Sequence, residues 1–407
     1  MRRQILCAAA VAFVAAAGSL GSGVLKGQAV GSPDQGADAT FAPPRTASGD
    51  PDLQGIWTYI YQVPLERPRQ HADKEFFTDE EIARLDEERA SLARRDARPG
   101  KKSEDDVAGA YNAVFNNFYR TGRRTSLIVD PPDGRMPAFA APVLERMKID
   151  REYWGALNQA TDLCRQRAEA CTGAKPGPPS PRRNEAPPSY QMNAINRADN
   201  PEDTGGGTRC LLGGLPDLGS GQNNFGGNFR RIVQSREWVA ITLDYGQGQV
   251  YHRTVPITTR PHVPSRIRQW WGDSRARWEG TTLVVDVTNF TPKTEYQGAR
   301  ENLHLIERFT RTGPEALEYS LTLEDPTTWT RPWTAKQDLV KQPDQPNRIY
   351  YEPRCHEGNY GLVGILASAR AEDEAYAKGR GPHPATRCLG GTCRGGENEQ
   401  FGRDPLQ

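Results

Sequence analysis

Residues 267–334 read IRQWWGDSRARWEGTTLVVDVTNFTPKTEYQGARENLHLIERFTRTGPEALEYSLTLEDPTTWTRPWT, and this stretch decides the fold. Its clearest signal is the strict alternation of apolar and polar side chains from Leu317 to Glu324. A period of two residues is that of a β-strand with one buried face. We therefore predict a strand at this place and interpret its neighbours from it.

Tight turns join this strand to the segments before it. Residues 312–315, TGPE, follow the segment NLHLIERFT, and glycine and proline supply the backbone angles of a sharp reversal. Earlier, Glu279 and Gly280 separate SRARW from TTLVVDV, where glycine suits the positive φ of a two-residue turn. Short strands joined in this way predict an antiparallel meander rather than a parallel sheet.

Similar strand patterns recur elsewhere in the chain. They occur in PDLQGIWTYIYQV from residue 51, in TSLIVDPPDGRM from residue 125, and in RIVQ, EWVAITLD and QVYHRTVPI after residue 229. The triplet Gly55-Ile56-Trp57 resembles the G-x-W signature of lipocalin-like barrels, in which the tryptophan plugs the closed end. We expect a mainly β protein whose antiparallel meander forms a barrel-like, lipocalin-like or strongly curved sheet, with a two-sheet β-sandwich as the alternative.

Two or three helices are expected at the periphery of this sheet. Thr78 and Glu81 form a capping-box pattern that predicts a helix over residues 78–95. The spacing of apolar residues predicts further helical segments over residues 142–171 and 361–377. Because the apolar residues of the first helix are few, we expect it to lie on the surface.

The organisation of the chain indicates export. Residues 1–29 have a basic start, an apolar run too short to span a bilayer and a small-residue end, so we expect a signal peptide that is removed. A linker over 30–50 leads to a single β-rich domain over 51–378, which includes a proline-rich surface excursion at 172–208. Residues 379–407 are expected to form a disulfide-stapled tail. The mature protein is therefore predicted to be periplasmic or secreted, without an integral membrane segment.

Cysteine usage supports this compartment. The six cysteines that remain after removal of the signal peptide are Cys164, Cys171, Cys210, Cys355, Cys388 and Cys393. An even number in an exported chain favours disulfides over metal or redox chemistry. The first two and the last two lie close enough in sequence to close small loops, which leaves Cys210 to pair with Cys355. Neither local pair has the spacing and partner ligands of a zinc site.

Charge and motifs exclude several classes of function. The 407 residues include 52 basic and 51 acidic ones, so no net field favours nucleic acid or an anionic membrane as a partner. The chain lacks H-E-x-x-H, a glycine-rich phosphate loop after a strand, and a G-x-S-x-G turn. We therefore expect no cofactor and no metal, and no motif specifies a reaction.

A set of sequence blocks resembles a family of exported bacterial proteins without assigned function. The blocks are PDLQGIW, RRTSLIVDPPDGR, IRQWWGDSRARWEGTTLVVDVTNFT, ENLHLIERFTR, EDPTTWTRPWT and CHEGNYGLVGILASARAE. The resemblance covers most of residues 51–375 and implies no activity. The family pattern carries the cysteines that match Cys210 and Cys355, which agrees with their pairing. Val250 stands where that pattern has a histidine.

Strand alternation identifies a carboxylate that faces the core. If Leu305 and Phe309 point inward, as their size suggests, Glu307 points inward with them. A carboxylate on an apolar face loses hydration, which favours its neutral form unless a cation is near. This is the condition under which a glutamate acts as a general acid or base. The alternative is a structural ion pair with an arginine such as Arg268 or Arg275.

Three further residues complete the predicted catalytic set. His304 lies on the polar side of the same strand, where a hydrogen-bonded or solvent-facing imidazole is the alternative to proton transfer. His356 and Glu357 belong to the polar block CHEGNYG, which could stand at the mouth of a barrel. Asn359 of the same block could instead be only the N-cap of the following helix.

A cluster of aromatic residues predicts a ligand site. Such rings line apolar pockets or stack on sugars, although core packing is their commonest role. The residues that we predict to bind a ligand are Trp270, Trp271, Trp278, Trp333, Arg268 and Tyr360.

Three functions fit these observations. The first is an exported barrel that binds a small apolar or aromatic molecule in a pocket. The second is a cofactor-independent acid–base enzyme, a lyase, isomerase or hydrolase, that uses the four predicted catalytic residues in the same pocket. The third is a carbohydrate-binding or envelope interaction module. Exposure of Trp270, Trp271 and Trp333 on a flat face would favour the third function over the first two.

Overall fold

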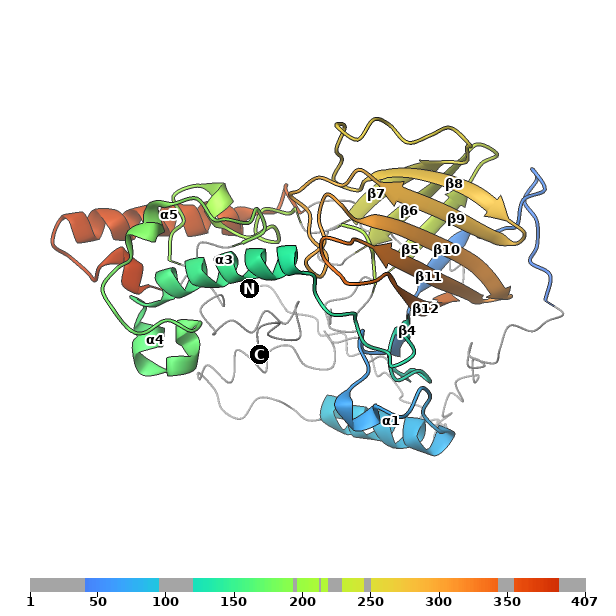
Figure 1. Cartoon of the computed structure of the whole chain (residues 1–407), viewed down its shortest axis with the longest axis horizontal. Coiled ribbons are helices and arrows are strands. Elements are labelled where there is room, and N and C mark those ends of the chain that lie inside the picture. The colour runs from blue at the N-terminus through green and yellow to red at the C-terminus, as the bar shows by residue number, and fades with distance from the viewer. Residues whose placement is uncertain are drawn as a thin grey trace, which may run out of the picture.

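The computed structural model describes residues 41–94, 120–192, 196–211, 214–218, 229–244, 250–342 and 355–387. Within them, nine antiparallel strands form one sheet that curves into a nearly closed barrel (Figure 1). The mainly β, barrel-like prediction is confirmed, and this single sheet replaces the alternative of a sandwich. In order around the sheet, the strands are β7 (Val250–Pro256), β6 (Trp238–Asp244), β5 (Phe229–Gln234), β1 (Gly55–Thr58), β12 (Trp333–Lys341), β11 (Ala316–Glu324), β10 (His304–Gly313), β9 (Thr282–Thr288) and β8 (Asp273–Glu279).

Three short strands lie beside this path. β4 (Ile128–Asp130) pairs with β12, and β2 (Tyr61–Gln62) pairs in parallel with β3 (Arg120–Thr121). β4 ends at Asp130 because Pro131 and Pro132 follow it, and proline has no backbone N–H for a strand ladder. The strand predicted in the segment TSLIVDPP is therefore confirmed, with its stop at the prolines.

The barrel closes between its two edge strands, β7 and β8. Ile257, just past β7, forms a parallel bridge with Ala276 of β8, and the backbone N–H of Thr258 donates to the Ala276 carbonyl at 2.9 Å. Residues 257–272, which we call the strap, connect the end of β7 to the start of β8. The strap therefore follows the seam along which the sheet closes on itself.

The two ends of the barrel differ. Short turns occupy one end, which we call the hairpin end; they are residues 235–237, 280–281 and 314–315. Longer segments occupy the opposite end, which we call the loop end; they include residues 289–303 and 325–332. The turn after β8 lies one residue further along than predicted, because Glu279 still pairs with Thr282 across it.

Trp57 and Arg311 fill the hairpin end. Trp57 is fully buried, and its indole N–H donates to the Leu53 carbonyl at 2.8 Å. The Arg311 guanidinium lies 5.8 Å from the centre of the indole ring and donates to the backbone carbonyls of Asp52 and Pro314 at 3.0 and 2.6 Å. The tryptophan of the G-x-W triplet thus lies at a closed end of the barrel.

Gly272, at the end of the strap, is expected to tolerate no larger residue. Its φ is +67°, and a Cβ there would lie 2.6 Å from the Thr288 carbonyl oxygen and 2.7 Å from Cγ1 of Val287. We expect Gly272→Ala to lower the free energy of unfolding by about 2–5 kcal/mol, the sum of a left-handed backbone term and an overpacking term. Urea-induced unfolding measures this loss.

Gly280 is the matched control for this substitution. Its φ of +63° carries the same backbone term, but no heavy atom lies within 4 Å of a Cβ built there. Gly280→Ala should therefore cost only about 1–2 kcal/mol. Equal losses at the two positions would show that the neighbours of Gly272 move aside at no cost.

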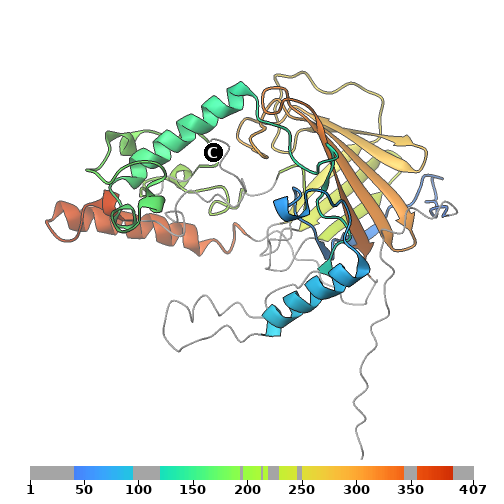
Figure 2. The same cartoon turned by 60° about the horizontal axis from the view of Figure 1, so that its bottom comes forward.

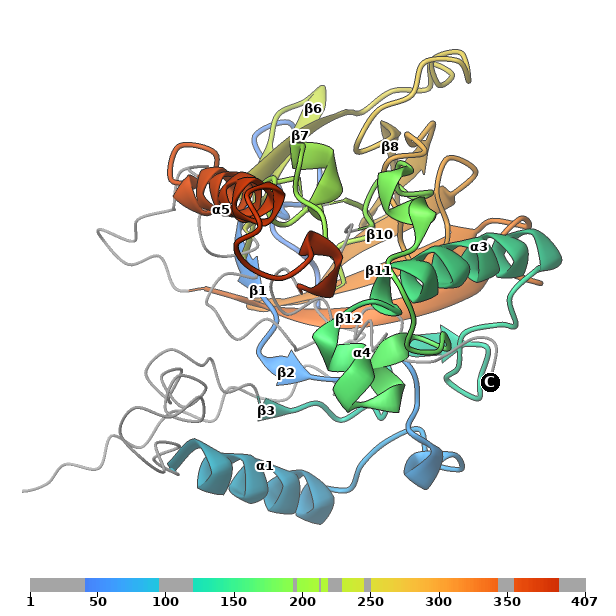
Figure 3. The same cartoon turned by 90° about the vertical axis from the view of Figure 1, so that its left-hand side faces the viewer.

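Helices lie outside the barrel, as predicted. α3 (Ala141–Asn158), α4 (Asp162–Gln166) and α5 (Tyr360–Ala377) gather at one side of it, and α1 (Asp79–Arg94) lies apart from them (Figure 2, Figure 3). The predicted segment 142–171 is thus divided into α3, α4 and a short final turn. A small second core of Tyr153, Leu157 and Met192 holds α3 against the chain that follows it.

The helix caps follow the patterns in the sequence. The Thr78 backbone N–H donates to the Glu81 carboxylate at 2.8 Å, and the Glu81 N–H donates to the Thr78 hydroxyl at 3.3 Å. Asn359 accepts from the Leu362 N–H at 3.2 Å and so caps α5. The predicted capping box is confirmed, and of the two roles considered for the CHEGNYG block, Asn359 takes that of the helix N-cap.

The proline-rich segment is a surface excursion only in its first half. Residues 175–188 are mostly exposed, as predicted. From residue 196 onward the chain is largely buried, and Arg197 forms an almost inaccessible ion pair with Asp203 at 2.6 Å. The predicted excursion to residue 208 therefore ends earlier, because this ion pair fixes the chain inside the helical side of the molecule.

Two disulfides are formed among the described residues, one local and one between distant parts of the chain. Cys164 is bonded to Cys171, and Cys210 to Cys355, which confirms both predicted pairings. The Cys210 bond joins the segment before β5 to the turn that starts α5. The predicted signal peptide and the predicted pair of Cys388 and Cys393 lie outside the described residues.

Candidate functional site

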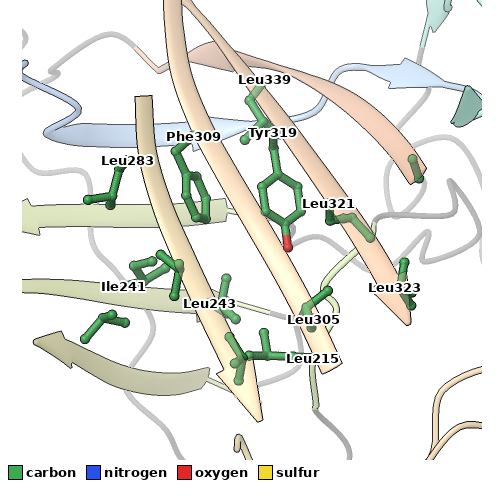
Figure 4. Close-up of a cluster of buried hydrophobic side chains, with 14 of the residues drawn as sticks. Leu215, Ile241, Leu243, Leu283, Leu305, Phe309, Tyr319, Leu321, Leu323 and Leu339 are labelled. Atoms are coloured by element: carbon green, nitrogen blue, oxygen red, sulfur yellow. The ribbon is translucent and has the colours of Figure 1, made fainter. Parts of the chain in front are cut away.

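The interior of the barrel is lined by every second residue of its strands. β10 points Leu305, Glu307 and Phe309 inward, and the inward-facing residues of β11 match them from Leu317 to Leu323. Figure 4 shows Leu305 and Phe309 of β10 in the same interior as Tyr319, Leu321 and Leu323 of β11 and as Ile241 and Leu243 of β6. Because apolar side chains dominate this set, any charged group among them is removed from water.

Glu307 is the centre of a buried hydrogen-bond network in this interior. Only 1% of its side chain is exposed. Its Oε1 accepts from Nη2 of Arg253 at 2.8 Å and from the hydroxyl of Tyr319 at 2.7 Å, and its Oε2 lies 2.7 Å from Nη1 of Arg253. The prediction that Glu307 faces the core is confirmed. Its cation is Arg253 of β7 rather than Arg268 or Arg275, because the closure of the barrel brings β7 within reach of β10.

A second buried arginine lies beside this network. Arg230 of β5 donates from Nε to Oδ2 of Asp217 at 2.9 Å and from Nη2 to the amide oxygen of Gln337 at 3.3 Å. Its guanidinium lies 4.8 Å from the centre of the Tyr319 ring, so Tyr319 connects the two ion pairs. We call this set of side chains the polar band; it comprises Asp217, Arg230, Arg253, Glu307, Tyr319 and Gln337.

Burial determines which groups of this region are charged. Burial and the neighbouring Glu307 carboxylate raise the pKa of the Tyr319 hydroxyl well above its ordinary value. Burial and the Asp217 charge also raise the pKa of Tyr296. Both hydroxyls therefore keep their protons, and that of Tyr319 donates to Glu307. The polar band contains two arginines and two acidic residues, so its formal charges balance.

Apolar side chains enclose the polar band on both sides. Figure 4 shows Leu283 and Leu339 towards the hairpin end, Leu305 and Leu323 towards the loop end, and the Tyr319 hydroxyl between them. All these leucines are inaccessible to solvent. Electrostatic interactions in such a surrounding are stronger than in water, and an unmatched polar group costs more.

Aromatic side chains gather at the loop end. Tyr251 lies against Trp271 with ring centres 5.3 Å apart, Tyr296 stacks on Trp333 at 6.5 Å, and Trp329 meets Trp333 edge-on at 5.4 Å. Burial raises the pKa of Tyr251 to about 12. The buried indole N–H groups of Trp329 and Trp333 have no hydrogen-bond acceptor among the described residues. This end of the barrel interior therefore offers donors as well as aromatic rings.

The four predicted catalytic side chains are not brought together. His304 lies three residues before Glu307 on β10, so it points to the outer face, where it contacts two carboxylates. His356 and Glu357 are exposed in the turn before α5. Only Glu307 lies in the interior, and the four residues therefore form no common acid–base site.

The predicted ligand-binding residues are divided between the interior and the surface. Trp333 is fully buried, so the flat face of three exposed tryptophans that would favour a carbohydrate-binding module is not formed. Trp271, Trp278 and Trp333 lie in or against the barrel core, whereas Trp270, Arg268 and Tyr360 lie outside it.

Two arginines of the site escaped prediction from the sequence. Arg253 lies between Tyr251 and Val255 in the inward-facing set of β7, and Arg230 precedes Ile232 in that of β5. This alternation was the available signal, but arginine usually points to solvent. The alternation could be interpreted correctly only if the closure of the barrel by β7 was already known.

Comparisons add no assignment to this geometry. Within the described residues, none of the helices combines the length and apolar character needed to span a bilayer. The same residues hold no group of three or more His, Cys, Asp or Glu side chains arranged for a metal ion. No protein-family model, curated protein or solved structure matched the chain.

Proposed function

We propose that this protein is an exported, barrel-shaped binding protein that encloses a small molecule with an apolar or aromatic body and one polar group. In this proposal the polar band contacts the polar group, and the leucines and aromatic rings contact the body. The observation that carries the proposal is the ion pair of Glu307 and Arg253 in the middle of an apolar interior.

A buried ion pair is a poor way to stabilise a barrel. Removing a carboxylate and a guanidinium from water costs several kcal/mol for each ion, and apolar residues of similar volume often stabilise a core as well or better. A barrel interior that served only stability would need no such pair, and the leucines that enclose the polar band are fully buried apolar side chains. The polar band therefore supports recognition of a polar group.

The unmatched donors favour an acceptor on the bound molecule. Each buried donor without an acceptor costs about 1–3 kcal/mol, and Trp329 and Trp333 present two of them among the described residues. A carbonyl, ether or carboxylate oxygen would accept from these N–H groups. The stacked rings of Tyr296 and Trp333 suit an aromatic body.

Two fluorescent probes test the proposal. Anilinonaphthalene sulfonate and N-phenylnaphthylamine share an aromatic body, and only the first carries an anionic acceptor group. We expect the full chain to bind both probes and to prefer the sulfonate. Arg253→Met/Glu307→Leu should lose most of that preference and retain the neutral probe, because the substitutions remove the charges and keep the apolar volume. Fluorescence titration measures both affinities.

The matched control removes an ion pair from the outer face of the barrel, between Arg308 of β10 and Glu279 of β8. Arg308 and Glu279 form an ion pair at 2.8 Å with about two fifths of each side chain exposed. Arg308→Met/Glu279→Leu should bind both probes as the wild-type chain does. If the wild-type chain binds neither probe, an enclosed ligand of this class is contradicted; if the interior variant keeps the preference, the polar band has no part in recognition.

A further inference from the structure

Two histidines and three carboxylates form a continuous chain on the outer face of the barrel. His262 Nδ1 lies 2.8 Å from Oδ2 of Asp273, and its Nε2 lies 2.8 Å from Oδ1 of Asp286. His304 Nε2 lies 3.1 Å from Oδ2 of Asp286, and its Nδ1 lies 3.0 Å from Oε2 of Glu324. We call these five residues the histidine chain, in which Asp286 links the two rings.

Each ring nitrogen of the histidine chain faces a carboxylate oxygen. A neutral imidazole has one N–H and one lone pair, so one of its nitrogens would direct a lone pair at a negative oxygen. Only the doubly protonated ring donates from both nitrogens, and such charge-assisted bonds are strong. Two protonated rings would oppose three carboxylates, and Arg275, which lies 3.0 Å from Asp273, adds a third positive group.

The histidine chain fastens the strap to the sheet. His262 belongs to the strap, while the carboxylates come from β8, β9 and β11. The Val263 backbone N–H also donates to Oδ2 of Asp273 at 3.0 Å, and the Asn289 side chain donates to the Val263 carbonyl at 2.8 Å. The strap contains no acidic residue, and its other charged side chains, all exposed, are Arg260, Arg266 and Arg268.

Two further pairs of charged side chains lie on this outer face. Arg308 of β10 pairs with Glu279 of β8, and Lys336 of β12 pairs with Glu318 of β11. The histidine chain is linear, and its members do not converge on one point as metal ligands do. Whether each contact of the histidine chain is attractive therefore depends on the protonation of its two imidazole rings.

We propose that the histidine chain is a pH-dependent latch, which holds the strap on the seam between β7 and β8 while both rings are protonated and releases it when they are not. Loss of a proton from a ring replaces an attractive contact with a repulsive one, because a lone pair then faces a carboxylate. The strap should leave before the sheet does, since the sheet has its own ladder of backbone hydrogen bonds. The latch does not depend on whether the barrel binds a ligand.

The direction of the effect follows from two groups of the chain. The hydrogen bond to Asp286 raises the pKa of His304, so its contribution to stability is complete below its ordinary value of 6.5 and is lost as the pH rises through the raised pKa. The hydrogen bond from His304 lowers the pKa of Asp286, whose contribution is present above 3.8 and is lost as the pH falls through the lowered pKa. The latch is therefore tightest between pH 3.8 and pH 6.5, where both contributions are present.

Hydrogen exchange of the full chain tests the latch. The Val263 amide, which donates to Asp273, reports on the strap, and the amides of β11 report on the sheet. After correction for intrinsic exchange, we expect the protection of Val263 to fall about tenfold or more between about pH 6 and about pH 9, because histidine charge changes in this range. Protection in β11 should stay constant.

Variants separate the latch from a general effect of pH. His262→Gln should show low protection at Val263 at both pH values. His252→Gln is the matched control, because its ring on β7 bonds the Thr242 hydroxyl at 2.9 Å on an exposed part of the surface, and it should behave as wild type. Nitrogen chemical shifts of the wild-type rings, which need no variant, should show both nitrogens of His262 and His304 protonated at about pH 6. A neutral ring at that pH, or protection of Val263 that does not change with pH, would overturn the latch.

Discussion

Replacing Arg253 with methionine is expected to lower the free energy of unfolding by about 3–5 kcal/mol, because a buried carboxylate is left without its cation. The side chains of Arg253 and Glu307 are 7% and 1% exposed, so water cannot take over the role of the guanidinium. The Tyr319 hydroxyl still donates to Glu307, but it brings no positive charge. Urea-induced unfolding followed by tryptophan fluorescence measures the loss.

A second substitution should reverse most of this loss. Arg253→Met/Glu307→Leu removes both charges. We expect its free energy of unfolding to lie within about 2 kcal/mol of the wild-type value, since replacing a buried pair by apolar residues is often neutral or stabilising. The Tyr319 hydroxyl then loses its acceptor, and this reduces the free energy of unfolding of the double variant by about 1–3 kcal/mol. This double variant is therefore suitable for the binding experiment proposed above.

Arg308→Met is the control for the single substitution. Its ion pair with Glu279 lies on the exposed face of β10, where such pairs contribute about 0–1 kcal/mol. A loss at Arg253 no larger than the loss at Arg308 would mean that water reaches Glu307 in solution. That result would contradict an enclosed ion pair, and with it the argument that the polar band is kept for recognition.

Removing the disulfide of Cys210 and Cys355 is expected to cost about 5 kcal/mol when the loss is estimated from chain entropy alone. The bond spans 145 positions in the sequence, and strands β5 to β12 all lie within the loop that it closes. Without this bond, the part of the unfolded chain that contains most of the barrel strands gains conformational entropy. Unfolding of Cys210→Ala/Cys355→Ala in urea measures the effect.

The second disulfide provides the comparison. Cys164 and Cys171 are only seven positions apart, so the same estimate gives about 2 kcal/mol for Cys164→Ala/Cys171→Ala. Both variants remove one disulfide and add two alanines. If the two losses are equal, loop length does not set the contribution of these disulfides, and the entropic account is wrong for this protein.

The strands and caps were predictable because their signals are local. The alternation from Leu317 to Glu324 identifies a half-buried strand whatever it packs against. The capping box of Thr78 and Glu81 depends on residues three positions apart. The inward direction of Glu307 also follows from its own strand, since Leu305 and Phe309 flank it at the same period.

The site was predictable only in part because its partners are distant in sequence. Arg253 precedes Glu307 by 54 positions, and nothing in either segment indicates that they meet. His304 was assigned to the polar side of its strand, and the structure confirms that position. His262, in contrast, was not singled out, because a histidine in a segment without regular structure carries no periodic signal.

From the sequence alone, most strands of the barrel and the inward direction of Glu307 were predictable, because these depend on neighbours within a few positions, and counting suggested the pairing of four cysteines. The tertiary structure alone decided that β7 meets β8, which places Arg253 beside Glu307 inside the barrel and His262 beside Asp286 outside it. The physical reason is that ring closure depends on the summed twist and curvature of nine strands. No single segment of the chain encodes that sum.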